Sequence, residues 1–327
     1  MLDGIGIGIN AAPVAYVVRA GLVESVHLGH VVGLDGHGAR VVAIGEPDVT
    51  FFPRSSVKPL QAAAMLRAGL DLDGPLLALA AASHSGEPAH LDGVRRILQD
   101  AGLGVDDLQN TPDLPLDPDA SGRWRAADRP PSALAQNCSG KHAAMLATCR
   151  VAGWDTATYL DPGHVLQRAV RTTVEDLTGV PVTHTAVDGC GAPLFSSTPA
   201  GLARAFARIA TASPDTPEGR VAAALRAHPW WVAGTGRDVV RLAAAVPGLM
   251  AKDGAEGVFA AALPDGRAVA LKILDGSRRP VRAVVAAALR ALGVDGPELA
   301  AAGHTAVLGH GTAVGSIEPV LGRPAAG

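Results

Sequence analysis

Lysine is scarce in this chain, and its few lysines lie beside residues that could carry out chemistry. Of 28 basic residues in 327, only four are lysines, at positions 58, 141, 252 and 272. A lysine can lose its proton when it is desolvated and then act as a base, whereas arginine stays protonated in proteins. The four lysines of a chain that otherwise uses arginine are therefore candidates for catalysis or metal ligation.

The first candidate pair is Ser55 and Lys58, within RSSVKP. On the first turn of a helix, residues three apart share a face, so the hydroxyl and the amine come within hydrogen-bond range. A neutral lysine can activate a serine as a nucleophile, and S-x-x-K is a known nucleophile motif of serine hydrolases. The alternative is that Ser55 caps the helix and Lys58 lies at the surface.

A second cluster, Ser83-His84-Ser85, follows an apolar segment. It could supply a nucleophile or a hydrogen-bonding pair for a substrate. The alternative is a helix cap, with Ser85 at the N-cap of the next helix. A cap does not require Ser83 and His84, so these two residues remain functional candidates.

A third set combines Cys138, Lys141 and His142 with Asp188 and Cys190, about fifty residues later. Two thiols, an imidazole and a carboxylate are plausible zinc ligands. The spacing matches no zinc-finger pattern, and a lysine ligand would have to be neutral. Buried structural cysteines are the alternative.

The remaining lysines differ in their surroundings. Lys272 stands at the end of an otherwise apolar strand, ALKILDG. A buried lysine there is costly unless it is neutral or paired, which favours a functional role. Lys252 lies in the glycine-rich segment AKDGAEG, where the alternative is a solvated loop residue.

The elements that must position these residues change in type along the chain. Positions 14–45 are rich in β-branched residues and predict strands, and 55–245 has mainly helical spacing, interrupted by a Pro- and Asp-rich loop at 105–135. Near the C-terminus, a hairpin at 256–276 precedes a helix ending near 292. This order is not the alternating pattern of a parallel α/β sheet. It predicts an α+β fold, an antiparallel sheet built from about 10–50 and 250–292 with a large helical insertion.

Composition excludes several classes of partner. Hydrophobic residues make up 48% and charged residues 18%, as in globular proteins. A net charge of −3 and 3% aromatic residues give no reason to expect nucleic acid. No apolar run approaches the ~18–20 residues of a membrane helix, and the N-terminus lacks the basic region of a signal peptide. With an odd number of cysteines, a cytoplasmic location and no membrane partner are expected.

Five motifs in order, RSSVKP, ASHSGEP, QNCSGKHAAML, DGCGAP and AKDGAEG…ALKILDG, resemble the L-asparaginase II family of rhizobial-type, thermolabile asparaginases. The resemblance extends from Val14 to Leu292 and implies a single catalytic unit over 1–327. It also implies a fold similar to serine β-lactamases and serine-dependent glutaminases, a homodimer, no organic cofactor, and hydrolysis of L-asparagine to L-aspartate and ammonia.

The resemblance also implies roles for individual residues. Ser55 and Lys58 match one Ser-Lys pair, and Ser83 matches the second serine, with Lys272 as its partner in preference to Lys252. Cys138, Lys141 and Cys190 match a zinc site near the active centre. The substrate-binding residues expected from these motifs are Arg54, His84, Asp188 and His142.

The mechanism that follows is acyl transfer. Ser55, activated by Lys58, attacks the side-chain amide of asparagine, while Ser83 and Lys272 relay a proton to ammonia and backbone N–H groups stabilise the oxyanion. Which serine is acylated does not follow from spacing. A glutaminase and a β-lactam or peptide hydrolase are enzymatic alternatives, because one methylene of substrate changes selectivity by only ~1–3 kcal/mol. An amino-acid or zinc sensor is the non-catalytic alternative.

Overall fold

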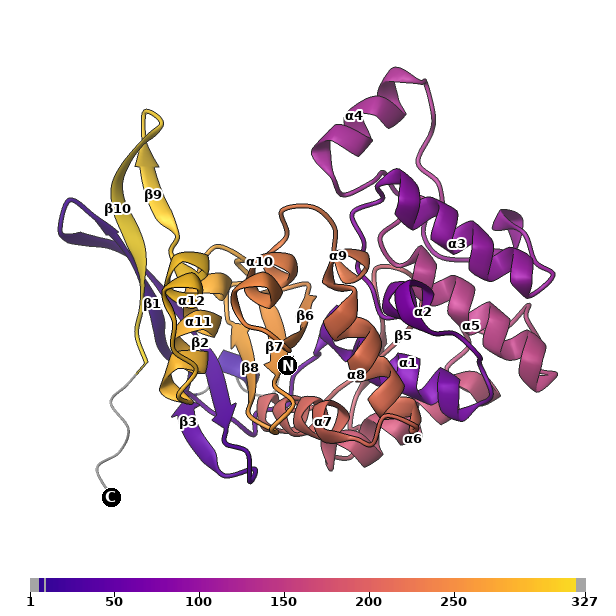
Figure 1. The fold of residues 1–327 in the computed structure, drawn as a ribbon, viewed down its shortest axis with the longest axis horizontal. Helices are drawn as coiled ribbons and strands as arrows, with labels where there is room; N and C mark the ends of the chain where they lie inside the picture. The colour runs from indigo at the N-terminus through magenta and orange to yellow at the C-terminus, as the bar shows by residue number, and fades with distance from the viewer. Residues whose placement is uncertain (1–5, 9, 322–327) are drawn as a thin grey trace.

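Strands from both ends of the chain form one antiparallel sheet (Figure 1). The computed structural model describes residues 6–8 and 10–321. The sheet has eight strands in the order β6-β7-β8-β2-β1-β10-β9, and β3 pairs with β2. Its strands are β1 (Ala12–Arg19), β2 (Leu22–Leu34), β3 (Arg40–Ile44), β6 (Met250–Gly254), β7 (Val258–Ala262), β8 (Ala268–Ile273), β9 (Ala306–Gly309) and β10 (Thr312–Pro319).

The long strand β2 joins the N-terminal and C-terminal parts of the sheet. Its first half pairs with β1, and its second half pairs with β3 and β8. A Cβ atom added at Gly29 would lie 2.4 Å from the carbonyl oxygen of Lys272. Real Cβ atoms do not come so close to backbone, so β2 needs glycine at this position to pair closely with β8.

Most helices lie in the insertion between β3 and β6, to the right in Figure 1. A two-stranded ribbon, β4 (Thr185–Val187) with β5 (Pro193–Phe195), lies among them. The helices are α1 (Lys58–Arg67), α2 (Gly74–Ala80), α3 (Pro88–Asp100), α4 (Pro118–Ala126), α5 (Ser139–Ala152), α6 (Val165–Thr178), α7 (Pro199–Thr211), α8 (Pro217–Ala227), α9 (Pro229–Val232), α10 (Asp238–Ala245), α11 (Val281–Ala291) and α12 (Pro297–Gly303), with 3₁₀ turns η1 (Gly6–Gly8), η2 (Arg54–Val57) and η3 (Val105–Asp107).

Helix α1 is the buried centre of the helical region. It contacts α2, α5, α6 and α8, and every residue from Lys58 to Leu66 is buried. A helix that is apolar on all sides is stable only inside a protein. Pro59 sits in its first turn, where the missing N–H has no helical partner to lose. The first residue of this interior helix is Lys58, so the fold carries that amine into the core.

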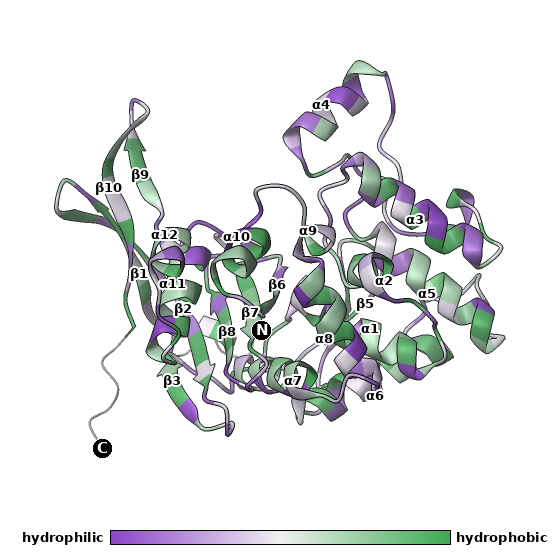
Figure 2. Ribbon diagram, in the orientation of Figure 1, coloured by the Kyte–Doolittle hydropathy of each residue, from purple (hydrophilic) through white to green (hydrophobic). Residues whose placement is uncertain are grey.

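Helices also cover the C-terminal strands of the sheet. Strands β6, β7 and β8 are buried at every position, so both of their faces are covered. Helix α7 packs on β2, β7 and β8, and α11 packs on β2, β8 and β10. Hydrophobic residues predominate in α11 and in the neighbouring strands (Figure 2). The edge strand β6 is therefore covered on both faces, and its unpaired edge faces the helical region.

The predicted fold class is confirmed, since N-terminal and C-terminal strands share an antiparallel sheet around a helical insertion. Two details differ. The sheet extends past position 292 into β9 and β10, and the predicted loop at 105–135 contains α4. The Asp117 side chain accepts a hydrogen bond from the Ala120 N–H, and this cap begins a helix that the Pro- and Asp-rich sequence obscures. No helix within the described residues is long and apolar enough to cross a membrane.

Candidate functional site

Two lysines meet at the hydroxyl of Ser83. The Nζ atoms of Lys58 and Lys252 each lie 3.0 Å from Ser83 Oγ, and Ser83 is 4% exposed. A hydroxyl oxygen has two lone pairs, so it can accept from both amines or give its proton to one of them. Ser83 is therefore placed for activation by a lysine base.

Three elements bring these residues together. Lys58 begins α1, Lys252 lies in the middle of β6, and Ser83 is in the loop after α2, where its N–H donates to the Val232 carbonyl at 3.0 Å. Strand β6 runs directly against η2. A Cβ atom at Gly254 would lie 2.9 Å from the Pro53 carbonyl oxygen, so this approach requires glycine.

Lys252 is fully buried beside a carboxylate. Its amine donates to Asp253 Oδ1 at 2.6 Å and to the Asp253 carbonyl at 2.7 Å. Burial lowers the pKa of Lys252 to about 8, against the pull of Asp253 and with a further lowering by the charge of Lys58. A neutral amine is therefore accessible near neutral pH, as a general base requires.

Asp253 is itself held by two arginines that sequence reasoning missed. Its Oδ2 atom lies 2.7 Å from Arg237 and 2.9 Å from Arg278. Burial raises the pKa of Asp253, but Lys252 and the two arginines together lower it well below its usual range. The only signal in the sequence is an aspartate next to a lysine, and nothing there indicates the distant arginines.

The structure corrects the expected partner of Ser83. Lys272 lies on β8, separated from β6 by β7, and its amine donates to the carbonyl oxygen of Glu256. Lys252 occupies the place expected for Lys272. The interpretation of Lys252 as a solvated turn residue was wrong because its segment pairs with β7 as the edge strand. Lysine, aspartate and glycine are poor strand formers, and packing overrides that preference here.

The expected Ser55–Lys58 hydrogen bond is also not formed among the described residues. The Lys58 backbone N–H donates to the Ser55 carbonyl, while its amine turns to Ser83, to the Ala82 carbonyl, and to Cys138 Sγ at 3.1 Å. Ser55 itself is half-buried. It follows Arg54, whose φ of 51° is unusual for a residue other than glycine and marks a strained turn.

The predicted metal ligands lie beside this centre. Cys138 and Cys190 pack together, and Lys141 donates to Cys190 Sγ at 3.1 Å. A hydrogen bond from the Cys190 thiol lowers the pKa of Cys138 well below its ordinary value, aided by the charges of Lys58 and Lys141. Burial opposes the charge of Lys141, but the two sulfur atoms outweigh it and raise the pKa of that amine.

This donor set fits a zinc ion. Among the described residues, no three His, Cys, Asp or Glu side chains gather as a metal site, so any set here must include the lysine. The lowered pKa of Cys138 favours its thiolate, which is the form that binds zinc. The hydrogen bond to Cys138 and burial raise the pKa of Cys190, and the pKa of Lys141 is raised too, so zinc would have to displace a proton from each of them. Two thiolates and a deprotonated Lys141 would give three donors, the number found in zinc sites that keep one position open.

Arg54 and Asp188 form an ion pair beside Ser55. Arg54 Nη2 lies 2.8 Å from Asp188 Oδ1, and both side chains are partly exposed. Burial raises the pKa of Asp188, but Arg54 and Lys141 lower it overall, so the carboxylate is ionised. The pair therefore presents one cation and one anion next to the serine.

The two histidines predicted to bind substrate, His84 and His142, are buried in the structure. His84 Nε2 lies 2.9 Å from Ser139 Oγ, and His142 Nδ1 lies 2.8 Å from the Tyr159 hydroxyl. Both imidazoles are completely buried, and burial with nearby positive charge lowers the pKa of each well below its usual value. They are neutral and are suited to holding the loop after α2 and the start of α5.

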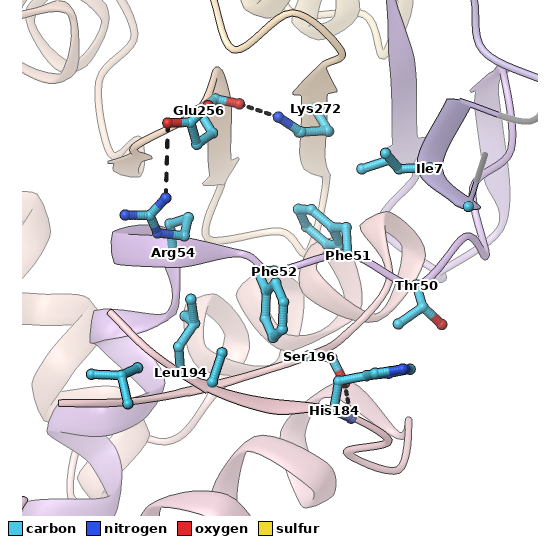
Figure 3. Close-up of a pocket in the computed structure, with 13 residues that line it drawn as sticks. Ile7, Thr50, Phe51, Phe52, Arg54, His184, Leu194, Ser196, Glu256 and Lys272 are labelled. Atoms are coloured by element: carbon cyan, nitrogen blue, oxygen red, sulfur yellow. Dashed lines mark hydrogen bonds and ion pairs between the residues drawn. The ribbon is translucent and has the colours of Figure 1, made fainter. Parts of the chain in front are cut away.

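A cavity of about 680 Å³ opens on the other side of Arg54 (Figure 3). Phe51, Phe52 and Leu194 give it apolar walls, and Lys272 lines it as well. Ser83, Lys58 and Lys252 are not among its lining residues. The cavity is therefore lined by other residues than those of the two-lysine centre.

Several solved structures are similar to this chain, all at low identity. A β-lactamase from Mycobacterium bovis is 16% identical, with a TM-score of 0.42, over 76% of this chain and 88% of that one. The hydrolase EstCE1, described as having promiscuous acyltransferase activity, is 14% identical with a TM-score of 0.41, over 88% and 94%. Simvastatin synthase from Aspergillus terreus is 10% identical with a TM-score of 0.40, over 81% and 90%. These similarities are too distant to assign chemistry.

Sequence comparison is more decisive. No curated protein matches the chain. The family model described as L-asparaginase II matches residues 15–319, nearly the whole chain. The match includes every residue of the two-lysine centre, the cysteine set and the Arg54–Asp188 pair. The chain therefore belongs to the L-asparaginase II family, a family of amidohydrolases.

Proposed function

We propose that this protein hydrolyses L-asparagine to L-aspartate and ammonia by acyl transfer, first to a serine that a lysine base activates and then to water. The observation that carries the proposal is the pair of lysine amines at 3.0 Å from Ser83 Oγ. Serine is a weak nucleophile unless an adjacent base takes its proton. Family membership supports the amide of asparagine as the bond that is cleaved.

Ser83 is the serine best placed for acylation, in place of Ser55, which the S-x-x-K motif put first. Lys252 takes the hydroxyl proton as Ser83 Oγ forms a bond to the amide carbon. The C–N bond then breaks, and the lysine returns the proton to the departing nitrogen, which leaves as ammonia. Water hydrolyses the ester by the reverse sequence of proton transfers, releasing aspartate and regenerating the hydroxyl.

Lys58 and Asp253 position this machinery. Lys58 is anchored by the Ala82 carbonyl and by Cys138, so its amine is fixed beside the Ser83 hydroxyl. Asp253 fixes the Lys252 amine through two hydrogen bonds. Because the Lys58 and Lys252 side chains are already fixed, they lose little conformational entropy when the reaction begins.

The Arg54–Asp188 pair matches the charges of an α-amino acid. A guanidinium can bind the α-carboxylate in a bidentate manner, and a carboxylate can accept from the α-ammonium. The two side chains bind each other at 2.8 Å, and the substrate would exchange that contact for two of its own. Specificity for an amino-acid amide over a simple amide would come from this exchange.

Cys138, Lys141 and Cys190 would hold zinc beside the centre. When bound, the ion would act as a Lewis acid and neutralise the two thiolates. The chain's own contribution is to keep Cys138 in contact with Lys58, at 3.1 Å, so that the cysteine set and the serine centre are mechanically joined.

The test is ammonia release by the purified protein, offered L-asparagine and L-glutamine in parallel with zinc present. Faster release from asparagine is expected. Release only from glutamine would make the protein a glutaminase. Tight asparagine binding without turnover by the folded protein would exclude the enzymatic proposal and favour a sensor.

A second experiment identifies the acylated serine. In Ser83→Ala, ammonia release should fall by at least about a hundredfold with folding intact, because the nucleophile is lost. Ser55→Ala provides the matched comparison and should retain acylation, detected by intact mass after rapid quenching with asparagine. Acylation that survives in Ser83→Ala and disappears in Ser55→Ala would reverse the assignment.

A further inference from the structure

Lys272 is a buried cation without a carboxylate partner. It is 8% exposed, and its amine donates to the backbone carbonyl of Glu256. Among the described residues, no carboxylate oxygen lies within the 4.0 Å of an ion pair from this amine. Burial of a charge is expensive unless the charge is paired. An amine kept in this state is expected to serve a ligand.

The amine faces the cavity described above. In Figure 3 the Lys272 side chain lies above Phe51 and Phe52, with Leu194 on the far side of the rings. The β4–β5 ribbon supplies Leu194, and the sheet supplies Lys272, so the cavity lies where the helical region meets the sheet. Ligand sites are frequent at such junctions, and about 680 Å³ falls within their usual volume.

The other charged side chains of the cavity already have partners. Arg54 binds Asp188 at 2.8 Å and lies 3.9 Å from Glu256. Glu256 is 62% exposed at the side chain and faces solvent as well as Arg54. Lys272 is therefore the one cation lining the described cavity that a bound anion would newly satisfy. A single free positive charge beside aromatic walls selects a monoanion with an apolar body.

We propose that this cavity is a second ligand site, distinct from the Ser83 centre, which binds a small monocarboxylate carrying an aromatic or branched apolar group. Lys272 binds the carboxylate, and Phe51, Phe52 and Leu194 bind the apolar part. Desolvation lowers the pKa of Lys272 against the more distant charges of Glu256 and Asp275, and a bound carboxylate in direct contact would oppose that lowering further. The site does not depend on which amide the enzyme hydrolyses.

The probe for the test is phenylbutyrate, with the uncharged phenylbutanol as its matched partner. Calorimetry measures the affinity of each compound for the full-length protein. Phenylbutyrate should bind at least about tenfold more tightly than phenylbutanol, which is the factor that one charge-assisted hydrogen bond supplies. Equal affinities would overturn the assignment of Lys272 as the anion-binding group.

Two variants locate the site. Lys272→Met should weaken phenylbutyrate binding at least about tenfold and leave phenylbutanol binding nearly unchanged. Its thermal midpoint should stay the same or rise, because an unpaired buried charge is removed. Arg279→Met removes an exposed cation on the loop after β8 and serves as the control, with wild-type affinity. Loss of binding in both variants, or in neither, would contradict the proposal.

Competition separates this site from the catalytic centre. Arg54 lines the cavity and is also the proposed partner of the substrate α-carboxylate, but the phenylbutyrate carboxylate would bind Lys272 instead. Saturating L-aspartate should therefore leave phenylbutyrate binding to the wild-type protein within about twofold, since Ser83 and both of its lysines also lie outside the cavity. Complete displacement would show that the cavity belongs to the active site and would sink the proposal of a second site. These experiments measure binding, so their outcome does not depend on whether the protein hydrolyses asparagine.

Discussion

At the scale of single residues, the unusual feature is a row of alternating charges that runs from the exposed Arg278 to a buried hydroxyl. Arg237 and Arg278 bind Asp253, Asp253 binds Lys252, and Lys252 reaches Ser83. Each charge has a partner of opposite sign, which makes the burial tolerable. This row of charges ends at the Ser83 hydroxyl, the one group that needs a base.

The first prediction concerns Lys252. Replacing it with methionine keeps the length of the side chain and removes the base. Ammonia release should fall by about 10²–10⁴-fold, the usual contribution of a general base. Arg241→Met, in an exposed position on helix α10, is the control and should match the wild type. A Lys252→Met enzyme with more than a tenth of wild-type activity would transfer the role of base to Lys58.

The second prediction concerns pH. Lysine acts as a base only when it is neutral, so activity should rise with pH through about 8, the pKa of Lys252. Asp253→Asn removes the negative charge that raises this pKa, so the rising limb should move to lower pH. Arg237→Gln removes a positive charge that lowers the pKa, so the limb should move to higher pH.

The pH dependence of kcat measures both shifts in the same buffers. Circular dichroism serves as the check on folding, because Asp253→Asn leaves two arginines near an uncharged amide. Shifts of the same sign in the two variants would be incompatible with Lys252 as the titrating base. A purely structural role for Asp253 would lower activity at every pH without moving the limb.

At the scale of elements, the site depends on how closely β6 approaches η2. Gly254→Ala would place a methyl group 2.9 Å from the Pro53 carbonyl oxygen. We expect a loss of about 1–3 kcal/mol in the free energy of unfolding, as for other overpacked positions. Activity should fall by more than stability explains, because β6 carries Lys252. Denaturant unfolding and ammonia release measure the two effects, and unchanged activity would show that the strand relaxes freely.

Most elements could be predicted from the sequence, but the residue partnerships could not. Helical periodicity identified the insertion, and the Pro-Asp-Gly turn identified the β7–β8 hairpin. Strand β6 was missed because its residues, MAKDG, form strands poorly on their own. Missing that strand led directly to the wrong lysine for Ser83. The pairing depends on sheet order, and spacing along the chain carries no information about which strand lies at an edge.

The cysteine set was identified more easily for a physical reason. Cys138 and Lys141 are three residues apart at the start of one helix, so most of the donor set is local in sequence. Its distant member, Cys190, is itself a rare residue in a turn next to β5. By contrast, Arg237 and Arg278 belong to the most common class of surface cation in this chain, and nothing distinguishes them before folding.

At the scale of the whole molecule, two hairpins project together from one end of the sheet (Figure 1). They are β1–β2 and β9–β10, and they expose large apolar side chains. Leu22, Val26 and Leu308 are 71%, 48% and 58% exposed. Exposed apolar clusters of this kind often mark contacts between proteins. We propose that this surface is where a second copy of the chain would bind in the homodimer that the family resemblance implies.

We therefore predict that the wild-type protein sediments as a dimer, at twice the mass of the 33.0 kDa chain. A variant with Leu22, Val26 and Leu308 all changed to serine should sediment as a monomer, because its apolar contact is lost. Val151→Ser, which changes an exposed apolar residue at the end of α5, is the control and should remain dimeric. A monomeric wild-type protein, or a dimer in both variants, would place the contact elsewhere or remove it.

The scarcity and burial of lysine also make the folded chain resistant to amine chemistry. All four lysine side chains are at most 8% exposed. Acylating reagents and lysine-specific proteases need these side chains in solvent, so they should react with the four lysines only when the core opens. Their rates would then report local opening directly, position by position, at Lys58, Lys141, Lys252 and Lys272. The four buried lysines therefore act as built-in probes of local unfolding.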